Sequence, residues 1–191
     1  MGTVNVRGLK MEARADAFKK TIINKRIDSC HVQETGFDAA TSAAHIRSLC
    51  QRNVNLFTIH RSICLWPWLL ELQQRKLAIC TGLLTQLTAI ERLIDSTQTL
   101  AQASTTRNAI LIVGDFNVPN YSSMRPAIDN DFASLFTRKG LTQKVTGSKH
   151  CNGNLLDLVL IDTTTLPTLL KVRVNHMQMS DHEFVKLSLL F

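Results

Sequence analysis

The strongest constraint on the fold is an unbroken apolar run that ends in polar residues. Residues 109–113 are all apolar and rich in β-branched types, which is typical of a strand buried on both faces. Gly114 ends this run, and Asp115 and Asn117 follow it. Because residues two apart in an extended chain point to the same side, both polar side chains are expected to face one cleft. Such a pair suits a metal or phosphate site, and the alternative is a strand end whose polar groups only satisfy a turn.

Composition indicates a folded domain with a polyanionic partner. The chain has 191 residues, of which 45% are hydrophobic, so a single domain spanning 1–191 with a sizeable core is expected. Its 22 Lys and Arg outnumber its 15 Asp and Glu, and the resulting net charge of +7 favours a polyanionic partner such as nucleic acid or anionic lipid.

Cysteine usage and hydropathy indicate where such a chain would be found. The five cysteines show no C-x-x-C spacing, which argues against a zinc site or a disulfide framework and favours a reducing compartment. We see no signal-peptide pattern, and no apolar run approaches the roughly 20 residues of a membrane span. An intracellular protein, nuclear or cytoplasmic, with no membrane partner is therefore expected.

The N-terminal segment has the pattern of a strand, a helix and a second strand, at 3–6, 10–25 and 27–33. Such a unit normally forms two parallel strands joined by a crossover helix. Asn5 lies in the first strand and Glu34 follows the second, so their side chains can converge at one edge of the sheet. For Glu34 alone, the alternative is an exposed loop carboxylate.

The remaining pattern predicts further elements and one buried pair. Helices are expected at 39–50, 83–100 and 132–136, and strands at 54–60, 76–81, 155–161, 172–175 and 184–189, with a strand or turn at 140–145. Asp157 lies inside an apolar strand pattern, where an unpaired charge is costly. The sequence therefore suggests that Asp157 pairs with His182, orients the imidazole and favours its charged form.

Five short motifs occur in an informative order. They are Asn-Val-Arg-Gly-Leu at 5–9, Val-Gln-Glu-Thr at 32–35, Gly-Asp-Phe-Asn at 114–117, Leu-Asp-Leu-Val at 156–159 and Ser-Asp-His at 180–182. Together they resemble the endonuclease/exonuclease/phosphatase superfamily, which includes apurinic endonucleases, DNase I-like nucleases and inositol phosphatases. Within it, they are most similar to the endonuclease domains of LINE-type retrotransposons.

This resemblance implies an α/β fold of the DNase I-like type, a four-layered sandwich of two mixed, mostly antiparallel sheets flanked by helices. It implies a phosphodiesterase that uses Mg²⁺, or Mn²⁺ in its place, to nick DNA as in retrotransposon target-site cleavage. The chain would then be one endonuclease/exonuclease/phosphatase-like domain, either free-standing or part of a larger retrotransposon polyprotein.

The same resemblance assigns the metal ligands. Glu34 would be the principal ligand, with Asn5 and Asp181 close to the cation. The residue types fit, because hard divalent cations prefer carboxylate and amide oxygen.

Four positions receive catalytic roles by the same comparison, and Asn5 is counted with them. Asp115 would orient or deprotonate the attacking water, and Asn117 would position a phosphate oxygen. His182, held by Asp157, would stabilise the pentacoordinate phosphorus. In-line attack on phosphate requires such charge neutralisation and a placed nucleophile.

The sequence also departs from the superfamily pattern. Relatives carry a phosphate-contacting tyrosine between the Glu34 and Asp115 motifs, whereas the only tyrosine here is Tyr121. Arg7 stands where some relatives have an acidic residue, and the middle of the chain is short. Two alternatives therefore stay open: a non-catalytic remnant that binds nucleic acid, and a phosphoesterase acting on inositol phosphates or phospholipid head groups.

Overall fold

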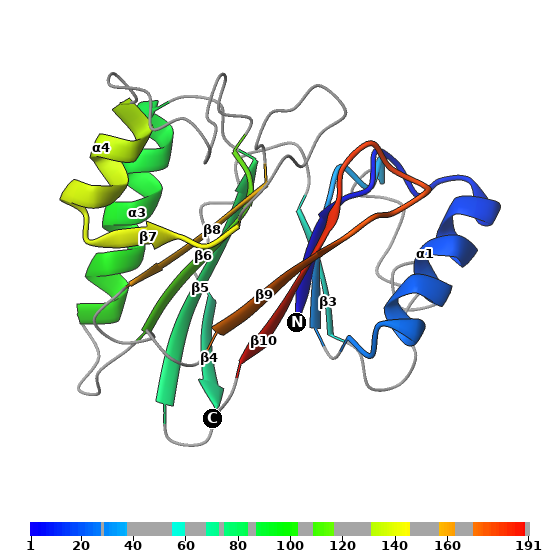
Figure 1. The fold of residues 1–191 in the computed structure, drawn as a ribbon, viewed down its shortest axis with the longest axis horizontal. Coiled ribbons are helices and arrows are strands. Elements are labelled where there is room, and N and C mark those ends of the chain that lie inside the picture. The colour runs from blue at the N-terminus through cyan, green and yellow to red at the C-terminus, as the bar shows by residue number, and fades with distance from the viewer. Residues whose placement is uncertain are drawn as a thin grey trace.

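The computed structural model describes most of the chain in ten segments. They are residues 1–27, 29–37, 55–59, 68–72, 75–83, 87–102, 109–116, 131–145, 157–162 and 170–189. Within these segments the protein is an α/β structure with two mixed sheets and three helices (Figure 1). No helix in the described part of the chain combines the length and hydropathy needed to cross a membrane.

The first sheet, called here the β1 sheet, is built from both ends of the chain. In spatial order its strands are β3 (Asn55–Ile59), β2 (Ser29–Gln33), β1 (Gly2–Asn5), β10 (Phe184–Leu189) and β9 (Leu170–Asn175). β1 runs parallel to β2, and α1 (Glu12–Asn24) connects them. The predicted strand–helix–strand unit with parallel strands is thus confirmed. β10 then pairs antiparallel with β1, which places residues 180–182 beside the end of β1.

The second sheet, called here the β6 sheet, comes from the middle of the chain. In spatial order its strands are β4 (Trp68–Leu72), β5 (Arg75–Leu83), β6 (Ala109–Asp115), β8 (Asp157–Asp162) and β7 (Leu141–Gln143). β5 and β6 are parallel and are joined through α3 (Leu87–Gln102), whereas α4 (Asp131–Arg138) precedes β7. Over both sheets, antiparallel pairings outnumber parallel ones among the described strands.

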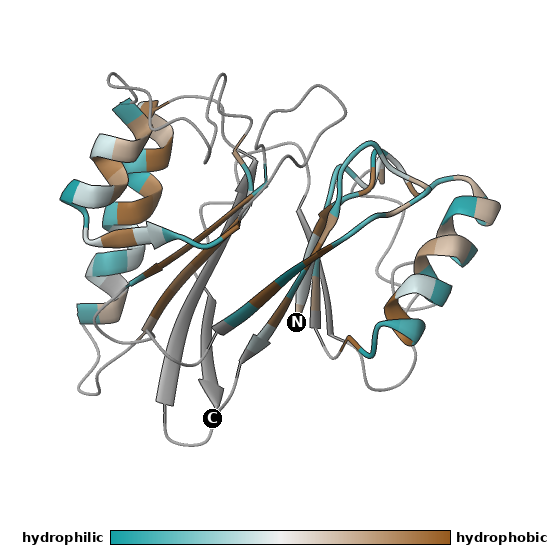
Figure 2. Cartoon of the chain, viewed as in Figure 1, coloured by the Kyte–Doolittle hydropathy of each residue, from teal (hydrophilic) through white to brown (hydrophobic). Residues whose placement is uncertain are grey.

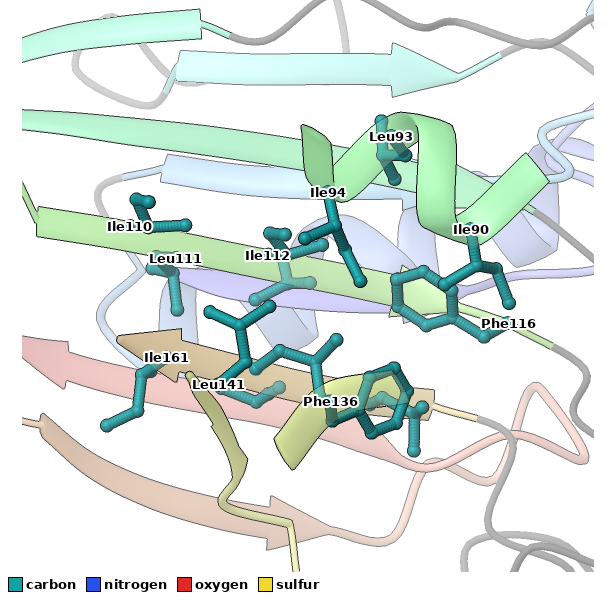
Figure 3. Close-up of a cluster of buried hydrophobic side chains, with 14 of the residues drawn as sticks. Ile90, Leu93, Ile94, Ile110, Leu111, Ile112, Phe116, Phe136, Leu141 and Ile161 are labelled. Carbon is teal, nitrogen blue, oxygen red and sulfur yellow. The ribbon is translucent and has the colours of Figure 1, made fainter. Parts of the chain in front are cut away.

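The β6 sheet is covered on one face by α3. Ile90, Leu93 and Ile94 recur at helical spacing, are fully buried, and belong to one apolar cluster with Ile110 and Ile112 of β6 (Figure 3). We call these five residues the α3 core. Burying each such side chain contributes about 1.5–3 kcal/mol, so this packing fixes the position of β6 and of the residues at its end.

The β1 sheet is covered on its outer face by α1. Phe18 and Ile22 of the helix belong to a second apolar cluster with Val4 of β1, Val32 of β2 and Phe184 of β10. In Figure 1, α1 and the pair α3 and α4 lie on opposite sides of the molecule, with the two sheets between them.

The two sheets meet along faces of different character. Val185 and Leu187 of β10 are buried in the cluster of the β6 sheet, so this part of the contact is apolar. Along β1 and β2, the strand register pairs Thr3 with His31 and Asn5 with Gln33. All four of these side chains are buried polar groups. Figure 2 shows the contrast, with β6 and β8 largely hydrophobic and the turn between β9 and β10 largely hydrophilic.

Most element predictions agree with the structure to within a few residues, and two need comment. β6 continues through Gly114 and ends at Asp115, because its backbone stays paired with β8 up to Asp157. The strand is therefore two residues longer than the apolar run at 109–113, and Asp115 lies at the strand's end, as expected. The predicted helix at 39–50 lies outside the described residues, as do Tyr121 and Asn117.

Candidate functional site

The site begins where the two sheets touch, at the ends of β1 and β6. Asn5 is the last residue of β1, and its Nδ2 donates a 3.0 Å hydrogen bond to Oδ2 of Asp115 at the end of β6. Asn5 is fully buried and Asp115 is 3% exposed. This bond joins residues 110 positions apart and holds one carboxylate in a fixed orientation in a place shielded from water.

A second buried pair lies beside the first. Asp157 begins β8 directly opposite Asp115, and its Oδ2 lies 3.1 Å from Nδ1 of His182. The predicted contact between Asp157 and His182 is therefore confirmed. The other ring nitrogen, Nε2, lies 3.8 Å from Oδ2 of Asp115. The imidazole thus stands between two carboxylates, with Asp157 setting its ring orientation.

The electrostatic surroundings favour a charged His182. Burial alone would lower its pKa, because desolvation disfavours the charged imidazolium. The hydrogen bond to Asp157 and the negative charges of Asp157, Asp115 and Asp181 outweigh that penalty, so the pKa of His182 lies above its ordinary value of 6.5. The site therefore holds its histidine ready to carry a positive charge.

Arg7 connects the buried pairs to two further carboxylates. Its Nε lies 3.5 Å from Oε2 of Glu34 and 3.5 Å from Oδ1 of Asp181, and its Nη2 lies 3.2 Å from Nε2 of His182. The Arg7 side chain is 48% exposed. A neutral imidazole can accept the hydrogen bond from Arg7 at Nε2, whereas a charged one cannot and would instead form an ion pair with Asp115 at 3.8 Å.

Unusual backbone geometry aims two of these side chains. Arg7 and Glu34 both have φ near 50°, in the left-handed region that residues other than glycine seldom adopt. The Arg7 N–H also donates a 3.1 Å hydrogen bond to Oδ1 of Asn5. Such strain persists only where surrounding contacts impose it, and it is concentrated at functional sites.

The turn before β10 is fixed by a serine and an arginine. Ser180 Oγ donates to the Asn5 carbonyl at 2.7 Å and accepts from the His182 N–H at 3.1 Å. Arg14 of α1 donates to the carbonyls of Val6, Gly8 and Met179. These bonds tie the turn that carries His182 to the start of the chain.

The structure therefore brings together seven residues, which we call the site cluster. They are Asn5, Arg7, Glu34, Asp115, Asp157, Asp181 and His182. Six of them were sequence candidates, and the seventh candidate, Asn117, lies outside the described residues. Sequence reasoning noted Arg7 only as a departure, and it assigned no role to Ser180. The Ser180-x-His182 spacing could have indicated the turn, because serine hydroxyls commonly bind a backbone N–H two residues on.

The donor set can be compared with what a divalent cation requires. No group of three or more His, Cys, Asp or Glu side chains is arranged to hold a metal in the described part of the chain. Glu34 and Asp181 nevertheless each place one carboxylate oxygen near Nε of Arg7. The guanidinium therefore occupies the position between the two carboxylates. Mg²⁺ usually keeps several waters and takes only one or two carboxylates. In residue type the pair suits a hydrated divalent cation, but the described residues do not form a ready-made ligand group.

An open polar cavity of about 480 Å³ is bordered by Asp181, one of these two carboxylates, and by Arg7. Its lining consists of Arg7, Arg14, Gln178, Met179, Ser180 and Asp181. The exposed side of the site cluster thus opens onto a solvent-filled space, while Asn5, Asp115, Asp157 and His182 are buried behind it.

Comparison with known proteins gives no independent assignment. No family model matches the chain, and no curated protein matches it. The functional argument therefore depends on the sequence motifs and on the geometry of the site cluster.

Proposed function

We propose that this protein is a divalent-metal-dependent endonuclease that hydrolyses a phosphodiester bond of DNA. The observation that carries the proposal is the convergence of two buried pairs, Asn5–Asp115 and Asp157–His182, with Arg7 linking His182 to Glu34. One region of the protein therefore holds the Asp115 carboxylate in a fixed orientation, the oriented imidazole of His182, and the partly exposed carboxylates of Glu34 and Asp181. The arrangement of helices around two sheets supports the four-layered, DNase I-like sandwich that the motifs imply.

Glu34 and Asp181, with Asn5 nearby, are the residues that would hold Mg²⁺ or Mn²⁺. When bound, the cation would neutralise charge on the phosphate and on the leaving oxygen. Glu34 and Asp181 come from segments far apart in the sequence. They can bind one cation together only because the end of β2 and the turn before β10 lie at the same end of the β1 sheet.

Asp115 is proposed to accept the proton of the attacking water, or to orient that water. Its carboxylate suits this role because Asn5 holds it in one orientation and Asn5 is itself held by the Arg7 N–H. A general base at a fixed position typically contributes about 10²–10⁴-fold to the rate. Asn117 keeps its proposed role of positioning a phosphate oxygen.

His182 is proposed to stabilise the negative charge that develops on the phosphorane oxygens. Asp157 fixes the ring through Nδ1, and the other ring nitrogen, Nε2, which Arg7 contacts at 3.2 Å, is proposed to face the substrate. Because the pKa of His182 is raised, the ring is more often charged near neutral pH than a free histidine. A positive charge placed before the reaction stabilises the transition state without reorganisation of solvent.

DNA is proposed as the substrate because of charge and motif type. The net charge of +7 favours a polyanion, and the motifs are similar to those of retrotransposon endonucleases. The same similarity makes a place in a larger retrotransposon polyprotein part of the proposal.

One observation favours a second candidate, the non-catalytic remnant that binds nucleic acid. Arg7 places a positive charge between Glu34 and Asp181, which is where the cation would be held. A chain that never exchanges Arg7 for metal would bind DNA without cutting it.

Nicking of supercoiled plasmid with Mg²⁺, with and without EDTA, tests the proposal. Wild type is compared with Glu34→Gln and Asp115→Asn, and His182→Ala is matched by His176→Ala. His176 is an exposed histidine in the turn before β10, where it contacts Glu183 rather than the site cluster. The proposal expects EDTA-sensitive nicking that His176→Ala keeps and the three site variants lose.

Other outcomes would lead elsewhere. Salt-dependent DNA binding by folded protein with no nicking in Mg²⁺ or Mn²⁺ would support the remnant. Hydrolysis of a soluble inositol phosphate but not of plasmid would support a phosphoesterase. Nicking that survives in all three site variants would refute the assignment of this cluster.

A further inference from the structure

We propose that Arg7 is an internal counter-cation of the Glu34–Asp181 pair, which a divalent metal ion must displace in order to bind. The inference rests on the proposed function, because it takes these two carboxylates to be the metal ligands. It adds that the Arg7 side chain, to which the proposed mechanism gives no catalytic step, lowers the affinity for the metal.

The contacts of Arg7 are those of a substitute cation. One atom, Nε, lies 3.5 Å from both carboxylate oxygens, and the same guanidinium reaches His182 with Nη2. Two carboxylates that both lie against one guanidinium nitrogen would repel each other if that positive charge were absent. Arg7 supplies that charge within the polypeptide.

These contacts are loose enough to be exchanged. Charge-assisted hydrogen bonds between a guanidinium and a carboxylate normally measure about 2.7–2.9 Å, and both distances here are longer. The Arg7 side chain is 48% exposed and Asp181 is 41% exposed, so solvent screens both interactions. A divalent ion carries twice the charge of the guanidinium and can coordinate the carboxylate oxygens directly. At sufficient concentration it is therefore expected to displace Arg7 from the two carboxylates.

Exchange requires movement of the side chain alone. The Arg7 backbone is held by its N–H bond to Asn5 and lies in the left-handed region. The guanidinium borders the open cavity of about 480 Å³, which gives it a place to move without disturbing the buried pairs. The fold therefore separates a fixed part of the site cluster from one exchangeable cation.

The test is Mn²⁺ binding to the whole chain, measured by calorimetry and by the electron paramagnetic resonance of free Mn²⁺. Arg7→Asn removes the charge, and asparagine tolerates a left-handed backbone. Arg7→Gly does the same and cannot itself supply a metal ligand, which controls for coordination by the new amide. Arg173→Gln, at an exposed arginine on β9, is the matched control for the change in net charge.

The expected result is that both Arg7 variants bind Mn²⁺ on the order of tenfold more tightly than wild type, because two screened ion pairs no longer compete. Arg173→Gln should bind as wild type does, and Glu34→Gln should lose binding. If wild type binds Mn²⁺ and the Arg7 variants bind it equally or less well, the inference is overturned while the proposed function stands.

Two further outcomes separate the two ideas. If only the Arg7 variants bind Mn²⁺, Arg7 does exclude the metal, and the proposed activity of the wild-type chain is then refuted. If neither wild type nor the variants bind Mn²⁺, the carboxylate pair is not a metal site and both ideas fail.

Discussion

The α3 core and the buried half of the site cluster (Asn5, Asp115, Asp157 and His182) are both shielded from water, yet they are organised in opposite ways. In the α3 core, apolar side chains such as Ile94 and Ile112 stabilise the protein in proportion to the area that they remove from water. In the site cluster, Asp115, Asp157 and His182 are equally shielded, and they are held by specific polar contacts with one another and with Asn5. Packing tolerates small shifts, whereas a buried charge without its partner is costly.

One strand serves both regions. Along β6, Ile110 and Ile112 belong to the face beneath α3, and Asp115 lies on the alternate face, toward Asn5. The apolar face therefore positions the polar one. The difference teaches that changes in the α3 core should alter stability with little effect on chemistry. Isosteric changes in the site cluster that keep its hydrogen bonds should do the reverse.

The largest effect is expected for Asp115→Asn, which keeps the size of the side chain and removes its ability to take a proton. Nicking should fall on the order of 10²–10⁴-fold, as for loss of a placed general base. The amide oxygen can still accept from Asn5, so the urea midpoint should stay near that of wild type. An Asp115→Asn variant that unfolds at a lower urea concentration than wild type, or that nicks DNA at the wild-type rate, would contradict the expected difference between the α3 core and the site cluster.

Ile94→Ala should show the opposite behaviour. Removing this fully buried side chain from the α3 core leaves a cavity and should lower the free energy of unfolding by about 2–5 kcal/mol. Nicking per folded molecule, measured well below the melting temperature, should change little. A large loss of activity in protein that is still folded would mean that the α3 core and the site cluster are coupled.

Buried polar groups between the sheets should make stability depend on pH. Burial, with a smaller effect of the charged amino terminus, lowers the pKa of His31 from 6.5 to about 4. The unfolded chain therefore takes up this proton at a higher pH than the folded chain. Stability is fully present above pH 6.5, is lost as the pH falls toward 4, and the loss reaches about 3 kcal/mol.

Urea unfolding at several pH values checks this expectation. His31→Gln should flatten that part of the pH profile relative to wild type, and His176→Ala, at a histidine that is 74% exposed on its side chain, should leave it unchanged. An unchanged profile in His31→Gln would show that other groups cause the dependence.

The smallest effect is expected at polar contacts on the surface. Glu91 of α3 lies 3.2 Å from Arg138 and 3.7 Å from Lys139, and the Arg138 side chain is 61% exposed. Glu91→Gln should change the free energy of unfolding by less than about 1 kcal/mol, because solvent screens such pairs. A larger loss of stability in Glu91→Gln, measured by thermal melting, would mean that exposed ion pairs also matter strongly. Burial would then not be what makes the contacts of the site cluster important.

Local pattern was enough to predict most elements and part of the site. The apolar run at 109–113 predicted β6, and the strand–helix–strand pattern predicted that β1 and β2 are parallel, because side-chain periodicity and crossover geometry are properties of short segments. Asp157 could be matched with His182 because a charge inside an apolar strand must find a partner. Phosphodiester chemistry was inferred from motif order and stays a prediction.

Contacts between distant segments were decided only by the tertiary structure. Asn5 meets Asp115 because the β1 and β6 sheets pack with these strand ends together, which no local pattern specifies. The end of β6 at Asp115 was set by pairing with β8. In the sequence, Arg7 was noted only as a departure from the superfamily pattern. In the structure its guanidinium contacts Glu34, Asp181 and His182, because segments far apart in the chain meet there. Side-chain periodicity is encoded within short segments of the sequence. The charges that surround a given side chain, in contrast, come from groups that only the complete fold brings together.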